Sequence, residues 1–128
     1  MSVDDLAKEW MRFAKSDLTT ARHMFEDVYP KEVEIACYHS EQAAEKSIKG
    51  YLAFKGTVPP RTHDLIELCR LCMKYDSTFS DILDMCSGLI PYAVTVRYPN
   101  ELDVDEIITK NAISMAENIY RFCMSRIV

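Results

Sequence analysis

Four polar residues in the segment 32–55 carry side chains that could hold an anion. At about 100° per residue on a helical wheel, His39, Gln42, Lys46 and Lys49 fall within an arc of roughly 80°. The ammonium groups would supply positive charge, and the Gln and His side chains would supply directional donors to a phosphate or to a partner's carboxylates. The same pattern also fits the solvent-exposed side of an amphipathic helix, so both interpretations stay open.

A second candidate cluster is the tripeptide Arg97-Tyr98-Pro99. A guanidinium at the junction of a helix and a loop suits bidentate contact with a phosphate or carboxylate, and the adjacent phenol could stack on a base. The structural alternative is that Arg97 caps carbonyl groups and that Tyr98 fills the end of a helical bundle. We take Arg97 and Tyr98 as the first candidates for a ligand site.

Histidines and paired carboxylates offer weaker candidates for catalysis. Glu41 and Glu45 lie one helical turn apart, and nearby lysines make surface ion pairs the expected role of both. His23 lacks an acidic or cysteine neighbour that would make it a nucleophile's base. His63 precedes Asp64, which allows either a hydrogen bond at a helix start or a ligand contact. We predict no catalytic residue.

The cysteines do not predict a metal site. Cys69 and Cys72 have the spacing of a CxxC pair, but zinc needs two further ligands and the chain has no second such pair of Cys or His. All five cysteines occupy apolar positions of helical patterns, so we interpret them as small core residues. Neither a metal nor a cofactor is expected.

Composition and periodicity predict one helical domain over residues 1–128. The 128 residues include only three Gly and five Pro, which leaves few turns for an all-β fold. Apolar residues recur at helical spacing, and this predicts an all-α, antiparallel up-and-down bundle of four to five helices. The expected helices run from Asp4 to Pro30, then over 32–55, 64–75, 79–90 and 104–126.

The second half of the chain gives three further expectations. Asp103 and Glu106 have the spacing of a capping box, which predicts that the last helix starts there and buries Ile107 and Ile108 among other apolar residues. Pro91 should kink or end the fourth helix. The β-branched run 92–96 has no partner strand, so it is expected to continue the helix.

The charge balance excludes some classes of partner. A net charge of −5 argues against attraction of the whole surface to nucleic acid or to an anionic membrane, and it leaves local basic patches open. No apolar run approaches the roughly 20 residues that span a bilayer, and the N-terminus has no secretory signal pattern. The expected location is the cytoplasm, without membrane association.

Several motifs together resemble the HEPN domain family, whose name stands for higher eukaryotes and prokaryotes nucleotide-binding. The most specific is Gln42-Ala43-Ala44-Glu45-Lys46 followed by Lys49. It is flanked, in the family's order, by Trp10 with Ala14, Asp17, Leu18 and Ala21, by His63-Asp64-Leu65 with Leu68, and by Arg97-Tyr98-Pro99. The resemblance covers nearly the whole chain.

The resemblance implies a compact antiparallel helical bundle that often forms a homodimer. Stand-alone prokaryotic members are commonly encoded beside a minimal nucleotidyltransferase, and the pair is thought to act as a toxin–antitoxin or defence module. Many members are metal-independent ribonucleases with an Arg, four to six residues and then a His. In this chain the residues at that distance from Arg97 are Leu102, Asp103 and Val104.

The sequence therefore leads to three hypotheses. The first is a non-catalytic module that binds a nucleotide or phosphate group through Arg97 and Tyr98, with His39, Gln42, Lys46, Lys49 and His63 as further candidates, and that partners a nucleotidyltransferase. The second is a ribonuclease toxin with an atypical site that combines His39 or His63 with Arg97. The third is a pure protein-interaction module. Whether RNA is a ligand stays open.

Overall fold

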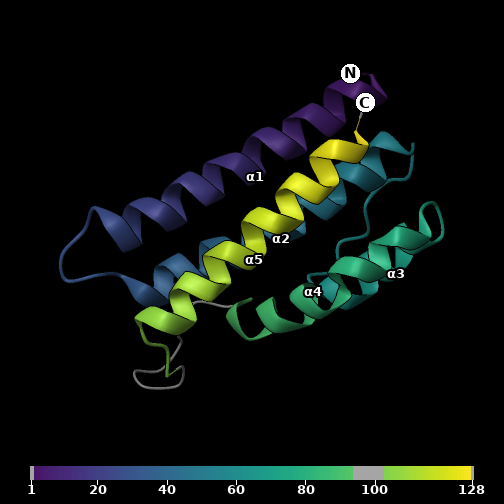
Figure 1. Cartoon of the computed structure of the whole chain (residues 1–128). Coiled ribbons are helices and arrows are strands. Elements are labelled where there is room, and N and C mark those ends of the chain that lie inside the picture. The colour runs from purple at the N-terminus through teal and green to yellow at the C-terminus, as the bar shows by residue number, and fades with distance from the viewer. Residues whose placement is uncertain (1, 94–102, 128) are drawn as a thin grey trace.

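The computed structural model describes residues 2–93 and 103–127, and every regular element in these ranges is helical (Figure 1). The prediction of an all-α bundle is confirmed. The elements are α1 (Val3–Glu26), α2 (Val33–Phe54), α3 (Leu65–Met73), the 3-10 helix η1 (Ser77–Ile82), α4 (Leu83–Leu89), the 3-10 helix η2 (Ile90–Tyr92) and α5 (Glu106–Arg126). None of the helices in these ranges is long and apolar enough to cross a membrane.

Short polar side chains set the starts of three helices. The Ser2 hydroxyl accepts from the Asp5 backbone N–H at 3.1 Å, and the Asp5 carboxylate accepts in return from the Ser2 backbone N–H, which forms a capping box. Asp64 caps α3 by accepting from the backbone N–H groups of Ile66 and Glu67. These caps satisfy backbone donors that a first helical turn leaves unpaired.

The start of α5 differs from the prediction. Asp105, and not Asp103, is the N-cap, and its carboxylate accepts from the Ile108 backbone N–H at 2.7 Å. The first turn of α5 also buries a different residue from those expected. Ile107 is 72% exposed and Ile108 is 36% exposed, whereas Thr109 is buried. The expectation that Ile107 and Ile108 belong to the core was therefore wrong.

Three long helices form the body of the bundle (Figure 1). Helices α1 and α2 are antiparallel across the turn at residues 27–32, whereas α5 runs in the same direction as α2 (Figure 1). Cys37 near the start of α2 contacts Thr109 near the start of α5, which agrees with the parallel arrangement. The parallel pair arises because the chain passes through α3 and α4 between α2 and α5.

The fourth expected helix is divided into shorter pieces. Residues 77–82 form the 3-10 helix η1, and only Leu83–Leu89 form an α-helix. Pro91 lies in η2, where the helical segment ends, as predicted. The expected continuation through 94–96 lies outside the described residues, as do Arg97 and Tyr98.

The core lies between α2, α5 and the α3–α4 segment. It holds Ile48, Leu52, Leu65, Leu68, Phe79, Ile82, Leu89 and Ile119. The five cysteines are buried and have free thiols, which confirms their interpretation as core residues. Burial raises the pKa of the Cys37 and Cys123 thiols, so the reactive thiolate form is disfavoured.

Helix α1 packs on the bundle mainly through small side chains. Ala7, Ala14 and Ala21 are fully buried, and Gly50 of α2 comes so close to α1 that a Cβ there would lie 2.6 Å from the Met11 Sδ. Two larger apolar residues of α1, Leu6 and Phe13, are exposed instead. The sequence pattern alone gave no reason to separate them from the core.

Candidate functional site

The polar stripe of α2 packs against Asp17, a buried carboxylate of α1. The His39 Nδ1–H donates to Asp17 Oδ1 at 2.8 Å, and the Lys46 ammonium donates to Oδ2 at 2.6 Å. Because both carboxylate oxygens accept hydrogen bonds, the burial of Asp17 is compensated. Asp17 thus ties two of the predicted ligand residues to the neighbouring helix.

A second carboxylate, Glu45, is arranged in the same way. The Lys49 ammonium lies 3.2 Å from Glu45 Oε2, and the His63 Nδ1–H donates to Oε1 at 2.9 Å. Glu45 and Lys49 are buried, whereas the His63 side chain is 72% exposed. The loop before α3 therefore presents an imidazole whose orientation is set by a buried carboxylate.

We call these six residues the polar seam: Asp17, His39, Glu45, Lys46, Lys49 and His63. Two lysines face two carboxylates in it, so their formal charges cancel. Each ammonium group is already paired with a carboxylate. The seam could therefore bind an anion through oriented hydrogen-bond donors, but it has little net positive charge. The seam lies along the packed surfaces of α1 and α2, and its most exposed member is His63.

Glu41 lies one turn before Glu45 and is fully buried. Burial, assisted by repulsion from Glu45, raises the pKa of the Glu41 carboxyl to about 8. Its Oε1 accepts from the Gln42 amide at 2.9 Å, and its Oε2 has no hydrogen-bond partner among the described residues. The expectation of surface ion pairs was wrong for Glu41, which is buried and forms no ion pair among the described residues. Glu45 does pair with the nearby Lys49, but the pair is buried and not on the surface.

Five of the predicted ligand residues lie along or beside the seam, and the other two fall outside the described residues. The first group comprises His39, Gln42, Lys46, Lys49 and His63. The second is Arg97 and Tyr98. The sequence analysis did not identify Asp17 as the residue that links the two helices. A signal was present, because Asp17 is spaced three and four residues from Ala14 and Ala21, which places it on the buried side of α1.

The described residues contain no group of three or more His, Cys, Asp or Glu side chains that could hold a metal ion. The side chains of the seam are imidazole, ammonium and carboxylate groups. Such groups can orient a ligand, and a histidine held by a carboxylate can also transfer protons.

The chain and its fold match known proteins over almost the full length. At 27% identity and a TM-score of 0.73, it is similar to the crystal structure of ST0689, an archaeal HEPN homologue, covering 95% of this chain and 98% of that one. The fold is also similar to that of TT1696 from Thermus thermophilus, with a TM-score of 0.72 at 21% identity, over 93% of this chain and 96% of that one. No curated protein matches the chain. The model of the HEPN domain matches residues 7–127, and the chain belongs to this family.

Proposed function

We propose that this chain is a non-catalytic HEPN module of the cytoplasm that binds a nucleotide or phosphate group and docks on a minimal nucleotidyltransferase. The two proteins would form a toxin–antitoxin or defence pair. The observation that carries the binding proposal is the polar seam, in which two buried carboxylates hold His39, Lys46, Lys49 and His63 in set positions. Donors that are ordered before binding lose less conformational entropy when a ligand arrives.

The proposal assigns different roles to the candidate residues. His63 contributes a directional contact through Nε2, since its Nδ1 is engaged by Glu45. Arg97 supplies the charge that the neutral seam lacks, and Tyr98 stacks on the base. The module is assigned as non-catalytic because the sequence has no His at the spacing from an Arg that the family's ribonucleases use.

Thermal unfolding tests the binding proposal. A nucleotide at about 100 times its dissociation constant should stabilise the folded protein by roughly 2.7 kcal/mol and raise Tm by several degrees. We expect Arg97→Ala to lose this shift while its Tm without nucleotide stays at the wild-type value. An unfolded Arg97→Ala protein would show that the arginine is structural, and an unchanged shift would remove it from the site.

A homodimer through α1 is part of the proposal. Val3, Leu6, Trp10 and Phe13 repeat at intervals of three and four residues, and three of them are more than two-fifths exposed. Leu6, Trp10 and Phe13 line an apolar hollow of about 250 Å³, and Glu9 lies at its edge. An alternation of three and four residues is the repeat of a helix pair, so α1 of a second copy fits this stripe.

Light scattering on the purified chain tests the dimer. We expect the mass of two chains, and Phe13→Glu should give the mass of one chain with an unchanged helical circular dichroism spectrum. A monomeric wild type at tens of micromolar would rule out this dimer.

Mixing the chain with a nucleotidyltransferase encoded beside it should give a stoichiometric complex on size exclusion, and separate elution of the two proteins would contradict the partnership.

A ribonuclease with an atypical site is the second candidate, because His63 and Glu45 form a pair suited to proton transfer. When Nδ1–H donates to the carboxylate, the neutral imidazole has a lone pair on Nε2 that could accept a proton from a ribose 2′-hydroxyl. The test is incubation of single-stranded and structured RNA with the protein, with and without chelator. Cleavage that is lost in His63→Ala would favour this candidate, and RNA left intact by wild type would exclude it.

A further inference from the structure

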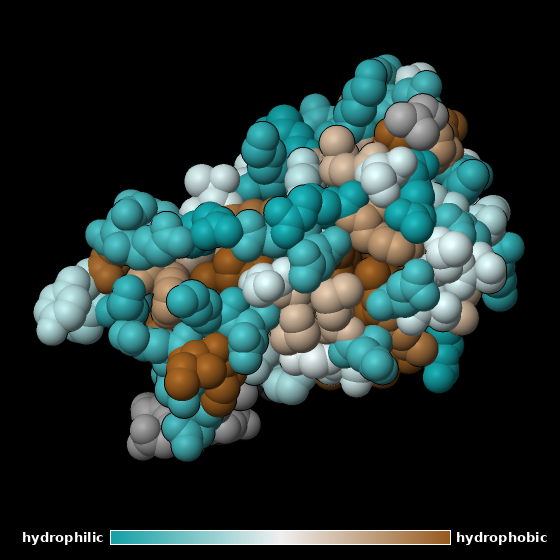
Figure 2. Space-filling model, viewed as in Figure 1, coloured by the Kyte–Doolittle hydropathy of each residue, from teal (hydrophilic) through white to brown (hydrophobic). Residues whose placement is uncertain are grey.

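A hollow between α1 and α5, on the other side of α1 from the polar seam, has a different charge. It measures about 260 Å³ and is lined mainly by Lys15, Leu18, Arg22, Glu117, Tyr120 and Arg121. We call it the cationic groove. On this face, hydrophilic side chains cover most of the two helices and apolar side chains show between them (Figure 2).

The groove keeps positive charge that the seam does not. Three cations face one carboxylate, Glu117, which forms an ion pair with Arg22. Lys15 has no carboxylate partner among the described residues, and Arg121 donates to the neutral amide oxygen of Asn118 at 2.9 Å. Arg22 also forms an ion pair with Glu26 at 3.0 Å, so three cations meet two carboxylates and the local excess is one positive charge.

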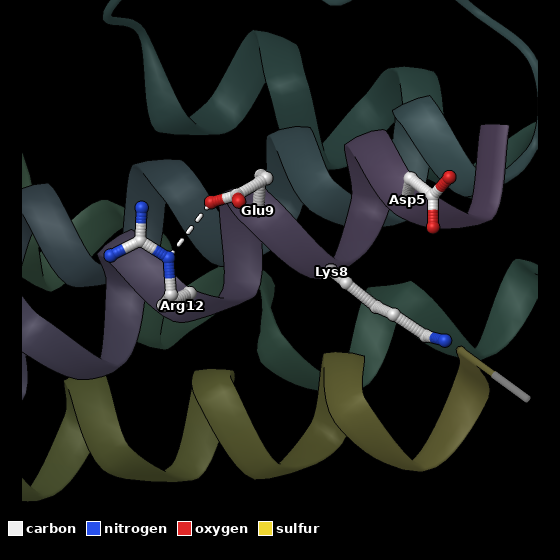
Figure 3. Close-up of a pocket in the computed structure, with 4 residues that line it drawn as sticks. All are labelled: Asp5, Lys8, Glu9 and Arg12. Atoms are coloured by element: carbon white, nitrogen blue, oxygen red, sulfur yellow. Dashed lines mark hydrogen bonds and ion pairs between the residues drawn. The ribbon is translucent and has the colours of Figure 1, made fainter. Parts of the chain in front are cut away.

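The surface of α1 toward its N-terminus carries no such excess, because its charges balance. A neighbouring open hollow is lined by Asp5, Lys8, Glu9 and Arg12 (Figure 3). Glu9 pairs with Arg12, whereas Lys8 extends toward the end of α5 (Figure 3). Lys8 and Lys15 are seven residues apart on one side of the helix, which separates their Cα atoms by about 10 Å.

Apolar and aromatic groups accompany these cations. Tyr120 is partly buried against the core, and Leu18 lies next to it in the lining. An aromatic ring beside unpaired cations is the combination that binds a base and its phosphates together. The volume of the groove suits part of one small ligand more than a protein segment.

We infer that the cationic groove binds the phosphates of a nucleotide through Lys15 and Arg121, with the base against Tyr120. The inference rests on the proposed nucleotide binding and adds a second site, on α1 and α5, that is separate from the polar seam. Lys46 and Lys49 of the seam are paired with Asp17 and Glu45, whereas Lys15 of the groove has no carboxylate partner among the described residues.

Calorimetric titration of the full chain tests the groove, with ATP and inorganic tripolyphosphate as probes. Lys15→Glu and Arg121→Glu should each raise the Kd for ATP about tenfold or more, since each loses a charge-assisted contact and adds repulsion. Lys110→Glu is the matched control. It makes the same change of charge on the exposed surface of α5 in a different hollow, and it should leave the Kd unchanged. Circular dichroism and Tm confirm that each variant is folded.

The outcomes separate the groove from the proposed function. ATP binding that is weakened by Lys15→Glu and Arg121→Glu, but not by Lys110→Glu, supports the groove. Binding that is lost in Arg97→Ala but unchanged in both groove variants overturns the groove and leaves nucleotide binding intact. No binding of ATP or tripolyphosphate by wild type contradicts both. Equal affinity for the two probes overturns the contact between Tyr120 and the base.

Discussion

At the scale of single residues, Asp17 is the contact that the seam depends on most. Removing it in Asp17→Ala leaves the partly buried Lys46 and His39 without an acceptor. We expect a loss of about 2 kcal/mol or more in the free energy of unfolding, measured by urea denaturation. The control is Asp27→Ala, which removes the exposed pair of Asp27 and His23 at the end of α1. This change should lower the free energy of unfolding by less than about 1 kcal/mol. Equal losses would show that the seam is no more stabilising than a surface pair.

The buried carboxyl of Glu41 should make the free energy of unfolding depend on pH. Burial raises the pKa of its carboxyl from 4.5 to about 8, so the folded protein keeps a proton that the unfolded chain loses. This contribution is fully present below about pH 4.5 and is lost as the pH rises to about 8, at roughly 1.4 kcal/mol per pH unit. In Glu41→Gln, which keeps the acceptor for Gln42, this slope should disappear.

The measurement is urea denaturation of wild type and Glu41→Gln at several values between about pH 5.5 and 7.5. Wild type should lose about 2 to 3 kcal/mol more than the variant over this range. Glu26→Gln, which neutralises an exposed carboxylate on α1, should keep the wild-type slope. A Glu41→Gln slope equal to that of wild type would mean that Glu41 does not hold the proton.

At the scale of the helices, the start of α5 provides a sharp test. Asp105→Ala removes the side-chain acceptor of the cap and should cost about 1 kcal/mol in unfolding free energy. Asp103→Ala, at the position that the sequence pattern favoured, should change it by less than about half of that, because Asp103 is exposed and does not cap the helix. A larger loss of unfolding free energy in Asp103→Ala than in Asp105→Ala, measured by chemical denaturation, would indicate that Asp103 is the cap.

The helices were predictable because their signals are local. Apolar spacing, Pro30, Gly56 and Asp64 place the ends of α1, α2 and α3 within a few residues of the expected positions. The start of α5 was misplaced because Asp103 and Asp105 both have side chains that can cap a helix. Only the backbone conformation decides which carboxylate meets a free N–H group, and a capping pattern does not specify it.

At the scale of the whole molecule, the candidate site could be predicted only in part. The stripe of His39, Lys46 and Lys49 was visible on one helix, but Asp17 neutralises Lys46 across 29 positions of sequence. The cationic groove was not visible, because Lys15 and Arg121 come from opposite ends of the chain and meet only when α1 and α5 pack together. Helical periodicity determines which residues share one helix face, and packing determines which faces meet.

We propose that this HEPN module binds a nucleotide without altering it. The most direct measurement is an NMR titration of the 15N-labelled chain with ATP, followed by the phosphorus spectrum of the same sample. We expect saturable amide shifts that cluster at Arg97 and Tyr98 and along the groove residues of α1 and α5, while ATP stays intact. Amide shifts that are absent at millimolar ATP, or ATP that is consumed, would contradict it.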